Sequence, residues 1–164
     1  MVSDKREFLY EFIRKNQEDL YRFAYSYVKN REDALDILQE SIVKALEAAD
    51  RLKNTESVKP WMLKIIINEA NGIFRKGKRT VKIKDYEKET AVFEYKDDIA
   101  EYINKQDMLK NIFELEDKYR IVIILRYYEE LKISEIAKTL GIKENTVKTR
   151  LYKALGILKR TLGD

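Results

Sequence analysis

The sequence of 164 residues contains no cysteine and no histidine, and it has only five glycines and one proline. Without cysteine a disulfide framework is excluded, and without either residue a zinc site is not expected. The two residue types most often used as nucleophile and base are also missing, and no spacing of serine, aspartate, glutamate or lysine suggests a replacement. The scarcity of glycine and proline disfavours a β-sandwich or barrel, whose many turns use both. We therefore expect an all-α protein that is not an enzyme and has no metal, no cofactor and no catalytic centre.

Long apolar runs are missing as well. No segment approaches the roughly 18 apolar residues that a membrane-spanning helix requires. The N-terminus reads MVSDKREFLYEF and has no apolar stretch after its charges of the kind that marks a signal peptide. A soluble, cytoplasmic protein is the expectation.

Charge is distributed unevenly along the chain. Residues 1–79 carry 16 cations and 13 anions, residues 80–104 carry 4 and 7, and residues 105–164 carry 13 and 9. Two basic modules therefore flank an acidic, polar stretch with little periodicity. We predict two small helical domains, residues 1–79 and 105–164, joined by a flexible linker over residues 80–104.

Helical periodicity runs through the first module. Over residues 34–49 the expected buried stripe includes Leu35, and the opposite face of the same helix carries Asp36, Gln39 and Glu40. A loop is expected over residues 50–59. An exposed acidic face is usually only solvated, so spacing alone identifies no partner for this helix.

A further helix is predicted from Trp61 to about Arg75. Pro60 fits its first turn, where the missing N–H costs nothing. Aromatic, amide and cationic groups on one helix suit unpaired DNA, because bases stack on the ring and phosphates follow the cations. The alternative is a tryptophan in the core followed by a solvated cationic helix end. The residues in question, on or just after this helix, are Trp61, Asn68, Asn71, Arg75, Lys76, Lys78 and Arg79.

Residues 131–162 form the most informative stretch of the chain. Ser134 is the expected N-cap of a short helix, and Gly141 stands where that helix should end in the left-handed conformation. From Lys143 to Arg160 there are six cations and one anion. A helix with one apolar and one cationic side suits the DNA major groove. A solvated amphipathic helix is the alternative, but the turn length, the glycine and the charge asymmetry together favour a DNA-binding helix-turn-helix. The expected apolar stripe of the second helix comprises Val147, Leu151, Ala154, Leu155 and Leu158.

Three runs of residues resemble motifs of bacterial RNA polymerase sigma factors. Residues 36–46, DILQESIVKAL, resemble the helix that binds core polymerase, and residues 60–68, PWMLKIIIN, resemble the promoter-melting helix. Residues 135–137, EIA, and 146–154, TVKTRLYKA, resemble the C-terminal helix-turn-helix. Their order and spacing are similar to those of the extracytoplasmic-function group of the sigma-70 superfamily. Within that group, the sequence resembles the sigma-V type.

The resemblance implies an alternative sigma factor that binds core polymerase and directs promoter-specific initiation, in an envelope or extracellular stress response. The implied partners are the core enzyme (its β′ clamp and β flap), promoter DNA and a membrane-anchored anti-sigma factor, with no small-molecule substrate. The residues implied for core polymerase are Asp36, Gln39 and Glu40. Those implied for the −10 element are Lys53, Asn54, Trp61, Asn68, Asn71, Arg75 and Lys76. Those implied for the −35 element are Asn145, Thr146, Lys148, Thr149, Arg150, Tyr152 and Lys153.

Two departures from the family pattern stand out. Gly72 occupies a position where many members have aspartate, and Glu116 follows Leu115 where Leu-Pro is common. The main alternative is an ordinary helix-turn-helix regulator that binds duplex DNA without core polymerase. The spacing of Trp61 and Asn68 in the melting-helix motif argues against it. A nucleic-acid-processing enzyme would need clustered carboxylates or a nucleophile with its base, and the sequence suggests neither.

Overall fold

The computed structural model describes residues 2–75 and 105–161, and within these ranges every regular element is a helix. The chain divides into two compact units, Met1–Lys84 and Asp85–Asp164. The prediction of an all-α protein with two helical domains is thus confirmed. The predicted linker, residues 80–104, lies outside the described residues, so its bounds stay a prediction. None of the helices in the described ranges has the length and apolar character needed to cross a membrane.

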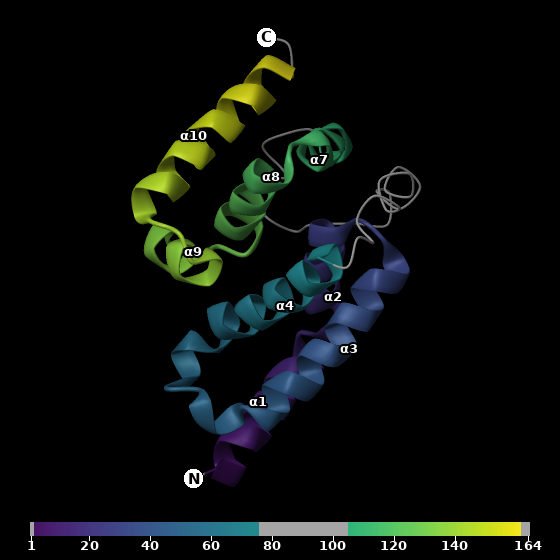
Figure 1. The fold of residues 1–164 in the computed structure, drawn as a ribbon, viewed down its shortest axis with the longest axis vertical. Helices are drawn as coiled ribbons and strands as arrows, with labels where there is room; N and C mark the ends of the chain where they lie inside the picture. Colours follow the sequence, from purple (N-terminus) through teal and green to yellow (C-terminus); the bar gives the residue numbers. More distant parts are fainter. Residues whose placement is uncertain (1, 76–104, 162–164) are drawn as a thin grey trace. The chain divides into compact units, whose positions relative to one another are not determined.

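Within residues 2–75 the first unit is a bundle of four helices and two short 3₁₀ turns (Figure 1). Helix α3 packs against both α2 and α4, and α1 packs along α3 and η1. The core side chains come from all four helices, and Leu9, Phe23, Ile37 and Met62 are fully buried. The elements are α1 (Val2–Lys15), α2 (Gln17–Val28), α3 (Arg31–Glu47), η1 (Ala49–Arg51), η2 (Thr55–Ser57) and α4 (Val58–Arg75).

Local side-chain chemistry explains where the helices of this unit begin. The side-chain oxygen of Asn30 accepts the backbone N–H of Asp33 at 2.9 Å and so caps α3. Pro60 lies in the first turn of α4, where backbone N–H groups have no partner within the helix, as predicted. The loop expected before it holds the two 3₁₀ turns, η1 and η2.

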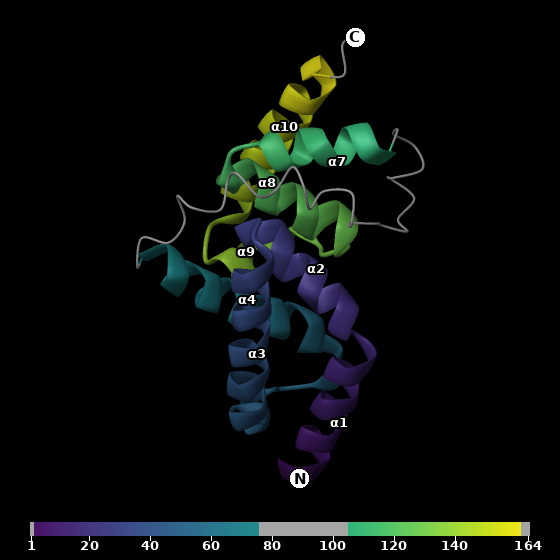
Figure 2. The same cartoon turned by 90° about the vertical axis from the view of Figure 1, so that its right-hand side faces the viewer.

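The second unit contains α7 (Lys105–Glu114), α8 (Asp117–Ile123), the π-helical turn η6 (Ile124–Tyr128), α9 (Ile133–Leu140) and α10 (Glu144–Thr161). Helix α10 packs against α8, α9 and α7 (Figure 2). Arg120 is only 2% exposed and secures the start of α8. Its guanidinium donates to the Asp117 carboxylate at 2.8 Å and to the Leu115 carbonyl at 3.1 Å. The helix therefore begins directly after Glu116, without the proline that is common there.

The turn between α9 and α10 follows the predicted helix-turn-helix pattern at its glycine. Gly141 has φ 70° and ψ 35°, in the left-handed region. The backbone N–H groups of Gly141 and Ile142 both donate to the carbonyl of Ala137, at 2.8 and 3.0 Å. These bonds satisfy a carbonyl that the end of α9 would otherwise leave unpaired.

Three details of the sequence interpretation are wrong. Ser134 is not the N-cap, because α9 already begins at Ile133 and the Glu135 carboxylate accepts the backbone N–H of Lys132 at 2.8 Å. Leu35 and Leu155 do not face the core, since their side chains are 49% and 41% exposed. The rest of each stripe already fills the space against the neighbouring helices. On α10 the buried residues are Val147, Leu151, Ala154 and Leu158.

Candidate nucleic-acid and protein interfaces

Helix α10 presents a polar and cationic face opposite its buried stripe. Lys148, Thr149, Tyr152 and Lys153 are all exposed, and Tyr152 is exposed to 83%. Helix α10 is held to its unit by its buried stripe, so the exposed Tyr152 ring contributes little to that packing. The position suits a side chain that contacts a partner, because its ring can pack on an apolar group while its hydroxyl donates a hydrogen bond.

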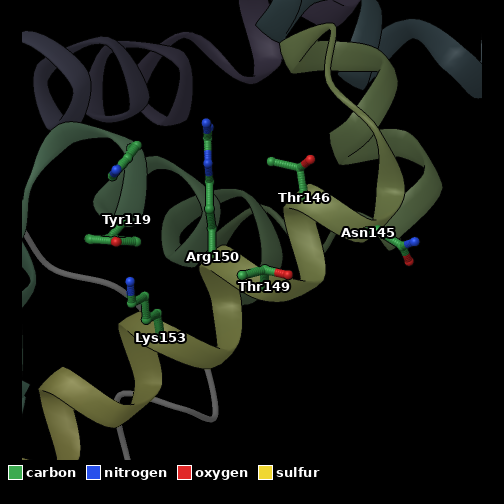
Figure 3. A pocket seen from close by; sticks show the side chains of 7 residues that line it. Tyr119, Asn145, Thr146, Thr149, Arg150 and Lys153 are labelled. Carbon is green, nitrogen blue, oxygen red and sulfur yellow. The ribbon is translucent and has the colours of Figure 1, made fainter.

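Five of the seven residues predicted for the −35 element line a pocket between α8 and α10 (Figure 3). Lys148 and Tyr152 do not line it. Helix α8 contributes two residues that sequence reasoning missed, Lys118 and Tyr119, and the Lys118 Nζ lies 5.2 Å from the centroid of the Tyr119 ring. No sequence signal could reveal them, because they precede α10 by more than 20 positions and only the packing of the two helices brings them to it. The α10 residues of the pocket are Asn145, Thr146, Thr149, Arg150 and Lys153.

Helix α4 also carries a polar face. Trp61, Asn68 and Arg75 follow one another at intervals of seven residues and so lie on one side of the helix, about 21 Å from end to end. Asn68 and Arg75 are exposed, while Trp61 is half-buried, which makes it a partly accessible stacking surface. Lys64, which sequence reasoning missed, is exposed on the same side. The predicted Lys76 lies outside the described residues.

Asn71 sits at the edge of this face and is tied to α2. The Tyr27 hydroxyl donates to Asn71 Oδ1 at 2.8 Å, and the Tyr27 ring stacks on Phe74 with centroids 5.6 Å apart. The amide oxygen of Asn71 is therefore engaged within the protein. Its NH₂ group is the part of the amide that can serve a ligand as a hydrogen-bond donor.

The loop before α4 holds the two remaining −10 candidates, Lys53 and Asn54, both exposed. The side-chain oxygen of Asn54 accepts the backbone N–H of Ser57 at 3.0 Å, so this residue also shapes the loop. Beside the loop, an open depression between α3 and α4 contains the ion pair of Lys44 and Glu69. The Glu69 carboxylate raises the pKa of Lys44 above its ordinary value, because hydrogen bonding and charge both favour the ammonium form. The lining residues are Lys44, Glu47, Ala48, Arg51, Ile65, Asn68 and Glu69.

The exposed side of α3 combines acidic, amide and apolar groups. Asp36, Gln39 and Glu40 are exposed as predicted, and Leu35 and Val43 are exposed to 49% each beside them. Leu35, Gln39 and Val43 follow at steps of four residues and so form one line along the helix. Exposed apolar groups bordered by charges are the usual composition of a protein–protein contact surface.

The two units match two family models. "Sigma-70 region 2" matches residues 12–80, and "Sigma-70, region 4" matches residues 112–158. The RNA polymerase sigma factor SigV of Bacillus subtilis is 44% identical over 147 residues, which cover 90% of this chain and 86% of SigV. The ECF RNA polymerase sigma factor SigW of the same organism is 29% identical, with 90% of this chain and 85% of SigW covered.

A solved structure extends the similarity to three dimensions. The sigma factor RpoE from Bartonella quintana, determined in complex with the anti-sigma factor NepR, has a TM-score of 0.71 to this chain and 26% sequence identity. The match covers 93% of this chain and 94% of RpoE. CnrH, determined with the cytosolic domain of CnrY, shares the fold at 18% identity and a TM-score of 0.66.

Proposed function

This chain belongs to the extracytoplasmic-function group of the sigma-70 family and is an alternative sigma factor that directs transcription, and from that premise we propose which of its surfaces performs which step. The observation that carries the proposal is α10, whose apolar stripe is buried while its opposite side exposes cations, hydroxyls and Tyr152. Such a helix, placed after a tight glycine turn, fits a major groove. The second unit reads the −35 element of promoter DNA with α10.

In the −35 contact, different side chains do different work. Residues near the start of the helix, Asn145, Thr146 and Thr149, lie deepest in the groove, where amide and hydroxyl groups reach base edges. Tyr152 extends the reading surface by one turn. The cations Lys148, Arg150 and Lys153 supply phosphate and guanine contacts, so affinity depends on salt.

The first unit recognises and opens the −10 element. The face of α4 with Trp61, Asn68 and Arg75 runs along the unpaired non-template strand. Lys76, outside the described residues, is proposed for the same strand. Asn71 offers its amide NH₂ as a donor, because one acceptor position of its oxygen is taken by the Tyr27 hydroxyl. Lys53 and Asn54 belong to the loop that holds a base flipped out of the duplex. Flipping costs a few kcal/mol, which the loop and the polymerase contacts offset together.

The exposed face of α3 binds the core enzyme. Asp36, Gln39 and Glu40 meet the β′ clamp, with Leu35 and Val43 as its apolar contacts, and the second unit meets the β flap. Two DNA-binding units on one enzyme raise the effective concentration of each at its site, so neither has to bind tightly alone. The chemistry belongs to the polymerase, and this chain acts in the cytoplasm as a specificity subunit rather than an enzyme.

A membrane-anchored anti-sigma factor holds the protein inactive until an envelope or extracellular stress signal arrives. Two similar structures contain partners relevant to this point, since RpoE is bound to the anti-sigma factor NepR and CnrH to the cytosolic domain of CnrY. We expect the anti-sigma factor of this chain to compete with core polymerase for the face of α3. A one-to-one complex that leaves core binding unchanged would contradict this.

Run-off transcription tests the proposed function. Purified core polymerase should produce promoter-specific transcripts only when this protein is added. The variant Gln39→Ala/Glu40→Lys should lose co-purification with core and run-off activity while keeping its helical circular dichroism. Glu7→Lys makes the same change of charge at an exposed residue of α1. It is the control and should behave like the wild type. If the protein binds duplex promoter DNA equally well without core and supports no run-off, it is a conventional helix-turn-helix regulator instead.

A further inference from the structure

The pocket between α8 and α10 is unusual in its charge. Three of its seven lining residues are cations, Lys118, Arg150 and Lys153, and the other four are Tyr119, Asn145, Thr146 and Thr149. None of the seven is acidic. The positive charges come from two helices that pack against each other, so the fold itself holds like charges together. Such a lining is suited to an anionic ligand.

The lining groups differ in how far they are buried. The Tyr119 side chain is only 8% exposed and is part of the core between the helices. Lys118 lies against the Tyr119 ring. Arg150 is half-buried, and Figure 3 shows its side chain extending between Tyr119 and Thr146. A guanidinium fork can bind a phosphate with two parallel hydrogen bonds. The hydroxyls of Thr146 and Thr149 provide neutral donors at the same pocket.

The position of the pocket on α10 identifies the source of the phosphate. Successive residues of an α-helix are about 100° apart around its axis. If Thr149 faces the bases, Arg150 lies about 100° away on the side toward α8, and Lys148 lies about 100° away on the other side. The pocket is then at the flank of the recognition helix, where the sugar–phosphate backbone runs when the helix occupies the major groove.

We propose that this pocket seats one phosphodiester of the −35 duplex, so that Lys118 and Tyr119 of α8 are DNA-binding residues. Arg150 and Lys153 then grip the backbone and fix the register of α10, while base reading stays with the residues proposed for it above, Asn145, Thr146, Thr149 and Tyr152. This assignment rests on the proposed function, because it needs α10 to enter the major groove. It extends the DNA contact beyond the helix-turn-helix to the helix before it.

The test replaces single phosphates by uncharged methylphosphonates. A promoter fragment is first selected from a randomised library by wild-type protein with core polymerase, and each −35 phosphate is then neutralised in turn. Wild type should lose affinity most strongly at the seated phosphate. Lys118→Ala should bind the unmodified fragment more weakly. It should lose less affinity than the wild type when that one phosphate is neutralised, and it should respond like the wild type at every other phosphate, because Arg150 and Lys153 remain in the pocket. Lys118→Arg keeps the charge and should restore the sensitivity.

Salt dependence gives a second readout. One lost phosphate contact lowers the slope of log affinity against log salt by about 0.9 unit. The ratio of wild-type affinity to Lys118→Ala affinity should therefore fall about threefold between 50 and 200 mM salt. Lys110→Ala removes an equally exposed lysine from α7 that does not line the pocket, and it should match the wild type.

The two proposals fail differently. If the wild-type protein with core selects no promoter and supports no run-off, the proposed function is wrong. If promoter binding is intact but Lys118→Ala and wild type share one methylphosphonate profile and one salt slope, the pocket does not hold a backbone phosphate. Competition by inorganic phosphate without any position-specific effect on the duplex would assign the pocket to a free anion and would also overturn the inference.

Discussion

Gly141 offers a quantitative test of the turn that aims the recognition helix. Its φ of 70° lies where L-residues with a Cβ are strained, by about 1–2 kcal/mol. A Cβ added at this position has no heavy atom within 4 Å, so Gly141→Ala creates no clash and the cost is purely conformational. Alanine also restricts the unfolded chain, which offsets part of that strain. We expect Gly141→Ala to lower the stability of the second unit by about 1 kcal/mol.

Gly156 provides a matched control on α10 itself. It is in the interior of the helix, and an added Cβ would meet only the end of the flexible Arg160 side chain, at 3.8 Å. Glycine in a helix interior costs about 0.5–1 kcal/mol relative to alanine. Gly156→Ala should therefore stabilise the unit by about that amount. The same chemical change is expected to have opposite signs at two positions 15 residues apart.

Native-state hydrogen exchange in the full chain measures both effects. The slowest amides of α8 and α10 should exchange about fivefold faster in Gly141→Ala and about two- to fivefold slower in Gly156→Ala. Trp61, the single tryptophan, belongs to the first unit, and its fluorescence during unfolding should be unchanged in both variants. Equal signs for the two substitutions, or no change in Gly141→Ala, would show that the left-handed backbone at Gly141 is not what stabilises the turn.

Two further predictions concern residues in unusual environments. Lys29 and Glu130 have φ of 60° and 61°, so replacing either by glycine should relieve strain. The free energy of unfolding of the unit concerned should rise by about 1 kcal/mol in each case, and an unchanged denaturation midpoint would contradict this. Asp117→Ala removes the carboxylate that accepts from the buried guanidinium of Arg120, while the acceptor carbonyl of Leu115 stays. We expect the second unit to be destabilised by about 2 kcal/mol. The loss is smaller than for a fully buried pair, because the Asp117 side chain is 29% exposed. Hydrogen exchange of α8 that stays as slow as in the wild type would refute this second expectation.

Helix limits that depend on local chemistry could be predicted from the sequence, and Pro60 and Gly141 are examples. The start of α9 shows where local reasoning fails, because two caps compete within four residues. Ser134 could cap a helix that begins after it, whereas Glu135 can reach back to the N–H of Lys132 and begin the helix earlier. The second arrangement adds helical residues while still satisfying one free N–H, and it is the one adopted.

Periodicity identifies the buried stripe of a helix but not its width. Ala154 and Leu155 are adjacent apolar residues, and the sequence offers no reason to separate them. In the structure Ala154 is fully buried against the neighbouring helices and Leu155 is 41% exposed. Leu35 is exposed on α3 in the same way, next to the residues proposed to bind polymerase. Apolar residues that lie beside the buried stripe, as Leu35 and Leu155 do, are candidates for contacts with a partner. Periodicity alone assigns them to the core.

The pocket between α8 and α10 illustrates a more general limit. An amphipathic helix must bury one stripe to stay attached to its domain, so less than its full circumference is available for DNA. Additional backbone contacts have to come from whichever helix packs beside it, here α8. Lys118 lies in a segment whose following residues are almost all buried and apolar, where a lone lysine is typical of a solvated position. Packing alone brings Lys118 to the same pocket as Arg150. The DNA contact proposed for Lys118 therefore has no signal in its own stretch of sequence.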